Sequence, residues 1–326
     1  MAEVSFLNVL KWSDEECRDY LEMQRWPTGP VCPKCGAENP YRISRKSATK
    51  NLVKNLYRCR ECRKDYTATV GTIFEDSKIP LSKWFAAIYL MCASKKGMSA
   101  HQIHRELDVT YKSAWFMCHR IREAMRDKDL FPLTGTVEAD ETYIYPHRKR
   151  GHKVLHERIR DEEQMGIRKP GPKGPTLEGK QVVFGIKERG GRVRSIVVPD
   201  NKARTLRPLL HQHVDPSARL MTDQAAVYRT IKGHLHHEMI NHEIEYVRGD
   251  VHTQGIEGYW SILKRGLNGT FHHVGVGYLG HYLHEFEFRF NSRKTSDAER
   301  FSALMAQMQG RVEWFCQNPQ PENPFA

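Results

Sequence analysis

Three acidic residues have the types and local surroundings of metal-binding carboxylates: Asp140, Asp223 and Glu257. Asp140 lies inside the β-prone stretch TVEADETYI, Asp223 ends the short stretch ARLMTD, and Glu257 lies near the start of the helical pattern QGIEGYWSILKRG. An isolated acid is usually a surface or capping residue, so each of them alone indicates little. Together they offer the hard oxygen ligands that suit Mg²⁺ or Mn²⁺. Two such ions about 4 Å apart can activate water or a hydroxyl and stabilise a leaving 3′ oxygen.

Four neighbouring acids compete for these roles: Glu138, Glu141, Glu243 and Glu245. Strand alternation places Asp140 on the polar face together with Glu138 and Thr142, and leaves Glu141 on the opposite face. The other two competitors precede the helical pattern, so they fit less well than Glu257.

Four cysteines form a second candidate metal site, arranged as two Cys-x-x-Cys turns: Cys32, Cys35, Cys59 and Cys62. Two such turns present four thiolates in the tetrahedral arrangement that structural Zn²⁺ requires. The basic, β-prone residues between the turns suit the hairpins of a zinc ribbon. The alternative is four buried thiols or a redox dithiol. The chain has eight cysteines, and the other four have no such partners and are expected to be ordinary thiols: Cys17, Cys92, Cys118 and Cys316.

The length and the net charge of the chain limit the classes of protein to which it can belong. At 326 residues the chain is long enough for two or more domains, and 51 Lys+Arg against 39 Asp+Glu give a net charge of +12. Such a charge favours polyanionic partners such as DNA. The N-terminus lacks a signal-peptide pattern, and the most apolar stretch, WFAAIYLMCA, is about half the length that crosses a bilayer. We therefore expect a cytoplasmic, nucleoid-associated protein without a membrane partner.

The segment after the cysteines predicts a helix-turn-helix. An apolar helix over 81–93 is followed by a helix over 98–107, for which Ser99 is a plausible N-cap. A short break at 108–110 precedes a helix over 111–125 that carries four basic residues: Lys112, His119, Arg120 and Arg122. A basic second helix of this kind enters the major groove of DNA. The alternative is a plain helical bundle with a basic solvated face.

The elements that must position the acids follow a mixed α/β order. The strand that carries Asp140 comes first. It is followed by a hairpin with a Gly-Gly turn, a helix, a strand that ends at Asp223, a second helix, a strand region and the helix with Glu257. The expected ranges are 134–145, 181–199, 202–214, 218–223, 226–235 and 238–248. This order matches the ribonuclease H-like layout, in which a central sheet carries acids at strand ends. The basic, Pro- and Gly-containing insertion at 146–180 is either a solubilising loop or a contact to phosphates.

Four motifs, in this order along the chain, resemble a known family: CPKC with CREC, VEADETYI, LMTDQAAVY and HTQGIEGYWSILKRGLNGTFHHV. The chain is similar to bacterial insertion-sequence DDE transposases of the Merlin-type group, which carry a zinc ribbon before an ISXO-like DDE domain. The resemblance covers nearly all of 25–295. It implies that Asp140, Asp223 and Glu257 bind metal and that Lys264, two turns past the glutamate, contacts DNA phosphate. Gln254-Gly255 stands where relatives often have Asn-Thr, so Gln254 is an alternative third ligand.

The resemblance also implies a domain organisation, which we expect as follows: an N-terminal helical segment (1–28), the zinc ribbon (29–76), a helix-turn-helix DNA-binding region (77–130), a ribonuclease H-like DDE catalytic domain (131–300) with the basic insertion, and a C-terminal helix and tail (301–326). The implied function is a transposase that binds the ends of an insertion sequence, cleaves at the 3′ ends and catalyses strand transfer into target DNA. Its expected cofactors are Mg²⁺ or Mn²⁺ and structural Zn²⁺, and its expected form is a homo-oligomer on DNA. The alternatives are a non-catalytic DNA-binding regulator on an inert ribonuclease H-like scaffold, and a general nuclease.

Overall fold

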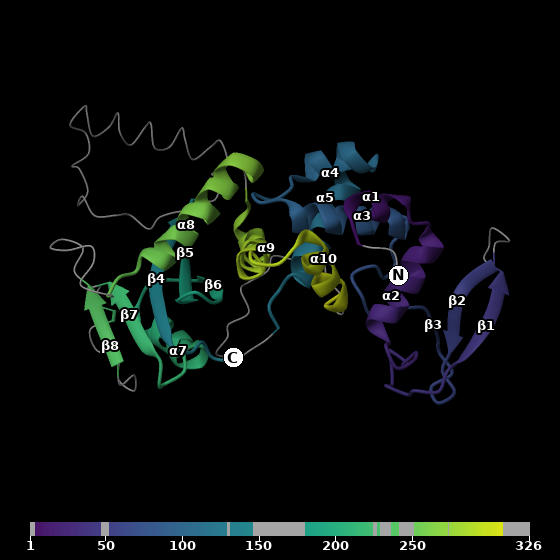
Figure 1. The fold of residues 1–326 in the computed structure, drawn as a ribbon, viewed down its shortest axis with the longest axis horizontal. Helices are drawn as coiled ribbons and strands as arrows, with labels where there is room; N and C mark the ends of the chain where they lie inside the picture. Colours follow the sequence, from purple (N-terminus) through teal and green to yellow (C-terminus); the bar gives the residue numbers. More distant parts are fainter. Residues whose placement is uncertain are drawn as a thin grey trace, which may run out of the picture. The chain divides into compact units, whose positions relative to one another are not determined.

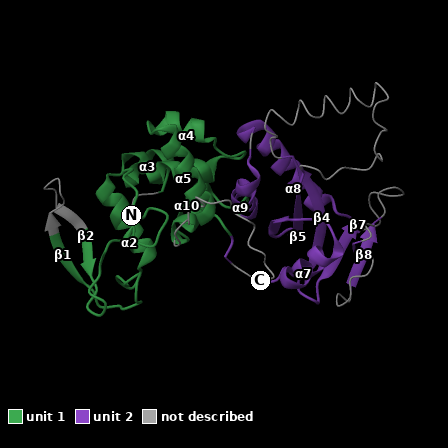
Figure 2. Ribbon diagram, turned by 180° about the vertical axis from the view of Figure 1, so that it is seen from behind, with its two compact units in different colours: residues 1–126, 292–319 green, residues 127–291, 320–326 purple. Residues whose placement is uncertain are grey.

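The computed structural model describes residues 4–46, 52–128, 131–145, 180–223, 227–228, 236–240, 251–272 and 274–308. The chain forms two compact units, shown in different colours in Figure 2. Unit 1 contains residues 1–126 and 292–319, and unit 2 contains residues 127–291 and 320–326. The chain therefore leaves unit 1 to build unit 2 and then returns. The predicted insertion at 146–180, apart from Lys180, lies outside the described residues, as does most of the predicted helix at 226–235.

Four helices of unit 1 come from both of its chain segments: α1 (Phe6–Lys11), α2 (Asp14–Arg25), α3 (Leu81–Ala93) and α10 (Asp297–Ala306). Three aromatic rings join these segments. The ring centroid of Phe85 lies 6.0 Å from that of Tyr20 and 5.9 Å from that of Phe301. Aromatic burial of this kind contributes strongly to a core. Unit 1 therefore depends on residues near both ends of the chain.

The ribbon of unit 1 is a three-stranded antiparallel sheet of β1 (Tyr41–Lys46), β2 (Leu52–Arg58) and β3 (Asp65–Tyr66) (Figure 1). Tyr57 and Tyr66 of the sheet form a small core with Trp26 and with three of the cysteines, Cys32, Cys59 and Cys62. The ring of Trp26 meets both tyrosine rings edge-on, with centroids 5.9 and 5.8 Å apart. These rings supply the apolar core that so small a sheet needs.

The helical pair α4 (Ala100–Leu107) and α5 (Tyr111–Ala124) is separated by three residues, as the sequence predicts. Ser99 caps α4 by accepting from the backbone N–H of Gln102 at 3.2 Å, which confirms its predicted role. Asp108 has a left-handed backbone conformation with φ 47°, which ends α4 and turns the chain.

The basic face expected on α5 requires a correction at Arg120. Its guanidinium donates to the backbone carbonyls of Ile73 at 2.6 Å and Glu75 at 2.8 Å, and the residue is 5% exposed. Two charge-assisted hydrogen bonds compensate for the burial of this cation. Arg120 is therefore a structural residue of unit 1, and the prediction that it belongs to a DNA-facing surface is wrong. The same correction applies to His119 and Arg122, which are 3% and 1% exposed. Lys112, at the start of α5, is exposed.

Unit 2 is built on a mixed five-stranded sheet with the order β6-β5-β4-β7-β8. The strands are β4 (Thr136–Ile144), β5 (Gln181–Glu188), β6 (Val193–Val198), β7 (Arg219–Asp223) and β8 (His236–Ile240). β5 pairs antiparallel with β4 and β6, whereas β7 is parallel to both β4 and β8. The strand that carries Asp140 is therefore central.

Helices cover both faces of this sheet. On one face, Val137 and Ala139 of β4 pack with Leu206 and Leu210 of α7 (Ala203–His213). On the other face lie α8 (Gln254–Gly266), the π-helical turn Leu267–Phe271 that continues it, and α9 (Leu279–Asn291). Alternate residues of β4 point to opposite faces, so Glu138 and Asp140 face α8 while Val137 and Ala139 face α7. In the part of the chain that the structure describes, no helix combines the length and the apolar character that spanning a membrane demands.

Candidate functional site

Asp140 and Asp223 come from neighbouring parallel strands. Ala139 of β4 pairs in register with Thr222 of β7, and one residue further along each strand come the two aspartates. Side chains in register on neighbouring strands project from the same face of a sheet. β7 ends at Asp223 while β4 continues to Ile144, so the two carboxylates lie where β4 extends beyond its neighbour.

Burial and nearby charges change the pKa of the Asp140 carboxyl group. Its pKa is raised to about 6; burial is the largest cause, the negative charges of Asp223 and Glu257 add to it, and a hydrogen bond from Trp260 acts in the opposite direction. Two further carboxylates are therefore close enough to disfavour ionisation of Asp140. A buried carboxyl held near other carboxylates is a common feature of functional sites, because a bound cation relieves the repulsion.

Glu257 lies in the first turn of α8, and its residue is exposed. Its Oε1 accepts a hydrogen bond from Thr253 Oγ1 at 2.9 Å. Gln254, the alternative third ligand, is also exposed and begins the same helix. The negative charge of Glu257 is the smallest of the named causes that act on the pKa of Asp140. The choice between Glu257 and Gln254 as the third ligand stays a prediction.

Glu138 and Glu141 are engaged in other contacts. Glu138 is fully buried; its Oε2 accepts from the backbone N–H of Ile256 at 2.8 Å, and its Oε1 accepts from Arg189 at 3.2 Å. Glu141 projects to the opposite face, where it accepts from the hydroxyl of Tyr228, and burial raises its pKa to about 7. Sequence alternation separates Glu141 from Asp140, but it could not show that Glu138 is an internal ion-pair and capping residue.

A cavity of about 220 Å³ lies on unit 2 between β4 and the C-terminal part of α8. Its described walls include Tyr143, Tyr145, Lys264, Asn268 and His272. The ammonium group of Lys180 lies 5.0 Å from the ring centroid of Tyr145. Lys264 on the cavity wall and Lys180 beside Tyr145 bring positive charge to this part of unit 2, which is an arrangement suited to phosphate.

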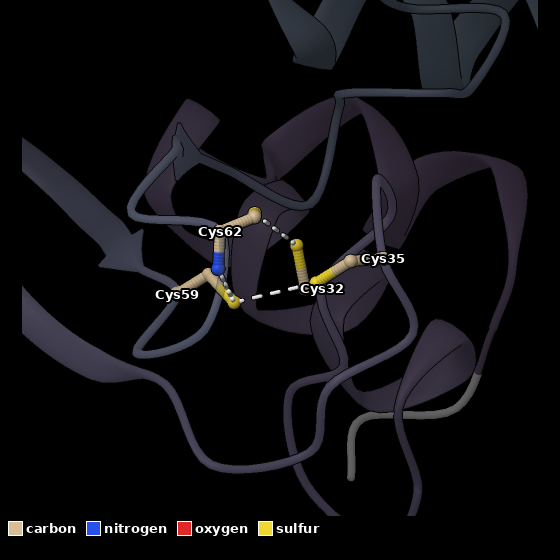
Figure 3. A group of neighbouring side chains, drawn as sticks. All are labelled: Cys32, Cys35, Cys59 and Cys62. Carbon is tan, nitrogen blue, oxygen red and sulfur yellow. Dashed lines mark hydrogen bonds between the residues drawn. The ribbon is translucent and has the colours of Figure 1, made fainter.

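The four predicted zinc ligands meet in the ribbon (Figure 3). Their sulfur atoms all lie within 4.8 Å of one another; Cys32 and Cys62 are 3.7 Å apart, and Cys35 and Cys59 are 3.5 Å apart. A tetrahedral ion with Zn–S bonds of about 2.3 Å requires sulfurs roughly 3.8 Å apart. The donor set and its spacing therefore fit structural Zn²⁺. Among the described residues, the three acids do not form a set this compact.

Local contacts favour the thiolate form at Cys59, whereas contacts with the neighbouring thiols raise the pKa of Cys35 to about 12. The backbone N–H of Cys62 donates to Cys59 Sγ at 3.5 Å, and this contact is the main cause of a lowering of the Cys59 pKa to about 7. The thiolate is the form that binds metal. The first cysteine turn ends at Gly36, whose φ of 78° is a conformation that glycine adopts without strain.

Comparisons with known proteins match the two regions of the chain that contain these residues. Residues 132–291, which include the three acids, match the ISXO2-like transposase domain, and residues 12–65, which include the four cysteines, match the transposase zinc-ribbon domain. An uncharacterized protein in transposable element ISH50 of Halobacterium salinarum is 30% identical over 285 residues, which cover 85% of this chain and 90% of that protein. An uncharacterized transposase-like protein of Haemophilus influenzae is 29% identical over 102 residues, or 31% of this chain and 82% of that protein. No solved structure matches significantly.

Proposed function

Since this chain belongs to the transposase family that combines a zinc ribbon with an ISXO2-like transposase domain, we propose that it binds the ends of an insertion sequence, cleaves at the 3′ ends and joins those ends to target DNA. The acid cluster would cleave and join the DNA, and unit 1 would recognise it. The active form would be a homo-oligomer on the DNA.

The three acids carry the catalytic part of the proposal. Asp140, Asp223 and Glu257 would hold Mg²⁺ or Mn²⁺, which supplies activation of the attacking oxygen and stabilisation of the leaving 3′ oxygen. Support comes from the raised pKa of Asp140, to which burial and the other two charges contribute. Lys264, on the wall of the neighbouring cavity, would bind a phosphate of the DNA end and orient it toward the acids.

The sheet order supports a ribonuclease H-like assignment for unit 2. In that layout a central sheet carries acids at strand ends. In the mixed order β6-β5-β4-β7-β8, Asp223 ends β7 and Asp140 lies on the neighbouring strand β4.

DNA recognition would use α4 and α5 as a helix-turn-helix, with the N-terminal residues of α5 in the major groove. Tyr111 and Lys112 begin α5 and are exposed, which supports this orientation. Arg120 plays no part, because it binds the backbone at Ile73 and Glu75. The ribbon would add contacts to the same DNA.

Strand transfer by the purified, zinc-loaded protein tests the proposal. DNA that carries the element ends is incubated with target DNA and Mg²⁺ or Mn²⁺, and cleaved and joined products are resolved. Asp140→Asn and Asp223→Asn are expected to lose both products while keeping DNA binding. Asp215→Asn is the matched control, since Asp215 lies in the same unit and its side chain caps the turn at Ser217. Cleavage without joining would indicate a nuclease, and binding without cleavage would indicate the non-catalytic regulator.

A further inference from the structure

Trp260 contacts the carboxylate of Asp140 directly. Its indole Nε1–H donates to Asp140 Oδ2 at 2.9 Å, and the residue is 4% exposed. A buried indole N–H needs an acceptor, and a carboxylate is the strongest acceptor that a side chain offers. The bond joins α8 to the central strand.

The backbone next to Asp140 is shaped to admit this ring. Gly185 of β5 pairs in register with Asp140 of β4. A Cβ atom at Gly185 would lie 2.4 Å from two carbon atoms of the Trp260 indole, a distance that such atoms do not reach without displacement. The indole therefore occupies the space that a side chain at position 185 would fill.

α8 provides both the donor and the third acid. Glu257 and Trp260 are three residues apart, so they lie on neighbouring positions of one helical face. Ile256 and Leu263 of the same helix are fully buried and pack in the same core as Trp260, which restricts the indole to a single orientation. Any displacement of α8 would therefore move Glu257 and the donor to Asp140 together.

We infer that Trp260 is a positioning residue for the metal site: its N–H fixes Oδ2 of Asp140, and so fixes the direction in which the remaining oxygen of that carboxylate faces a divalent cation shared with Asp223 and Glu257. Gly185 is the position that makes this arrangement sterically possible. The inference rests on the proposed function for the existence of the cation site. Hydrogen bonds to ligating carboxylates commonly change metal affinity 10- to 100-fold.

Direct Mn²⁺ binding to the full-length, zinc-loaded protein without DNA tests the inference. Trp260→Phe removes the N–H and keeps an aromatic ring in the core. It is expected to raise the Kd for Mn²⁺, measured by calorimetry, by roughly 10-fold or more. Trp84→Phe is the matched control, because Trp84 is also buried and donates its Nε1–H to a different acceptor, Ser77 Oγ, in unit 1. It is expected to keep the wild-type Kd.

A measurement on the wild-type protein avoids any dependence on the folding of a variant. The chain has six tryptophans, and ¹⁵N labelling of their indole nitrogens gives resolved N–H signals. Substoichiometric Mn²⁺ is expected to broaden one of them, that of Trp260, before the others. Earlier broadening of the Trp260 signal in the wild-type protein, together with a raised Kd for Mn²⁺ in Trp260→Phe, would support the inference.

The outcomes separate this inference from the proposed function. If wild-type protein binds Mn²⁺, Asp140→Asn does not, and Trp260→Phe binds as tightly as wild type, the positioning role is overturned while the metal site stands. If all indole signals respond equally to Mn²⁺, the contact to the metal ligand is also overturned. If wild type and Asp140→Asn both fail to bind Mn²⁺, the proposed metal site fails, and the role of Trp260 fails with it.

Discussion

Glu138 of β4 binds the first turn of α8 through the backbone N–H of Ile256, which donates to Glu138 Oε2 at 2.8 Å. The carboxylate thus satisfies a helix N–H that has no partner inside the helix, and its charge interacts favourably with the positive end of the helix dipole. Asp140 lies two residues further along β4, and Glu257 is the residue after Ile256. One short contact therefore sets the distance between two of the three acids.

This contact requires a glycine at position 255. A Cβ atom there would lie 2.6 Å from Glu138 Oε2 and 2.7 Å from Lys187 Nζ. We expect Gly255→Ala to displace the start of α8 and to lower the free energy of unfolding by roughly 1–3 kcal/mol, the usual cost of overpacking. Thermal unfolding and Mn²⁺ affinity measure the two effects.

The control for this prediction lies in the next turn of the same helix. Gly258 is exposed, and a Cβ atom there would meet nothing within 4 Å beyond the backbone of its own helix. Gly258→Ala is expected to stabilise the protein by roughly 0.5–1 kcal/mol, because alanine has the higher helix propensity. Equal effects of the two substitutions would mean that the Glu138 contact does not position α8.

Lys112 and Arg120, both basic and both on α5, are expected to respond differently to substitution. Lys112→Ala should weaken binding to DNA and reduce the salt dependence of the binding constant by about one ion, because a phosphate contact is lost. Arg120→Ala should instead destabilise unit 1 by roughly 1–3 kcal/mol, since the buried carbonyl of Ile73 and the partly buried carbonyl of Glu75 lose their donor. Binding isotherms at several salt concentrations and thermal unfolding distinguish the two effects. A reversed pattern would return Arg120 to the DNA surface.

Zinc removal is expected to unfold the ribbon and leave unit 2 folded. Elemental analysis should give about one zinc per chain, held by Cys32, Cys35, Cys59 and Cys62. Because metal binding supplies the folding free energy of such small sheets, a chelator should abolish amide exchange protection in β1–β3. The amides of β4 and β7 are the internal control. A ribbon that keeps its protection in chelator would show that these thiols do not depend on metal.

The sequence predicts those parts of the site that depend on local patterns. The two cysteine turns indicate their metal without any knowledge of the fold, because ligand type and spacing lie within short segments. Period-two alternation along β4 indicates the face of Asp140. The fold order then suggests that Asp223 lies on a neighbouring strand.

Contacts between distant residues could not be predicted in this way. Arg120 binds a carbonyl 47 positions away, so its burial is decided by tertiary packing, and its charge alone suggested a DNA contact instead. Trp260 lies 120 positions from Asp140, and its helical spacing indicates only a core residue. The need for glycine at position 185 follows from that same contact, and no local turn signal marks it.

The buried Glu287 is expected to make stability depend on pH. Its pKa is raised to about 8; burial is the largest cause and the charge of Asp127 adds to it, while hydrogen bonds from Ser195 and the charge of Arg194 act in the opposite direction. In the unfolded chain a glutamate ionises near pH 4.3. Between these values the folded protein keeps a proton that the unfolded chain has released, so stability falls as pH rises from roughly 4.3 to about 8.

Glu287→Gln carries no titrating proton and should remove this part of the pH dependence. The amide keeps an oxygen that can accept from the backbone N–H and the hydroxyl of Ser195. Urea unfolding of both proteins, followed at pH 5, 6, 7, 8 and 9, gives the difference directly. The variant should gain stability relative to wild type as pH rises; a difference that is constant over this range would contradict the raised pKa.

Glu257→Gln is expected to abolish cleavage and to leave DNA binding nearly intact. The substitution removes a negative charge from the acid cluster and keeps an oxygen that can accept from Thr253 Oγ1, so the first turn of α8 should be preserved. Metal affinity falls because a neutral amide is a weaker ligand for a hard cation. DNA binding persists because the proposed recognition helices belong to unit 1. Mn²⁺ titration, cleavage assays and mobility shifts measure these three properties on one preparation.

Two further variants separate phosphate binding from metal binding: Lys264→Ala tests the contact to phosphate, and Gln254→Ala tests the identity of the third ligand. Lys264→Ala should weaken the engagement of the cleaved end with a smaller loss of metal affinity, since a lysine on the cavity wall would bind phosphate and not the ion. Gln254→Ala should leave cutting unchanged if Glu257 is the ligand. Loss of cutting in Gln254→Ala together with normal cutting in Glu257→Gln would move the third ligand one helical turn toward the N-terminus of α8. If Gln254→Ala and Glu257→Gln both cut normally, Glu257 is a solvated helix residue that affects the pKa of Asp140 without holding an ion. We expect Glu257→Gln alone to lose activity, because the charge of Glu257 contributes to the raised pKa of Asp140 and a bound cation would relieve that repulsion.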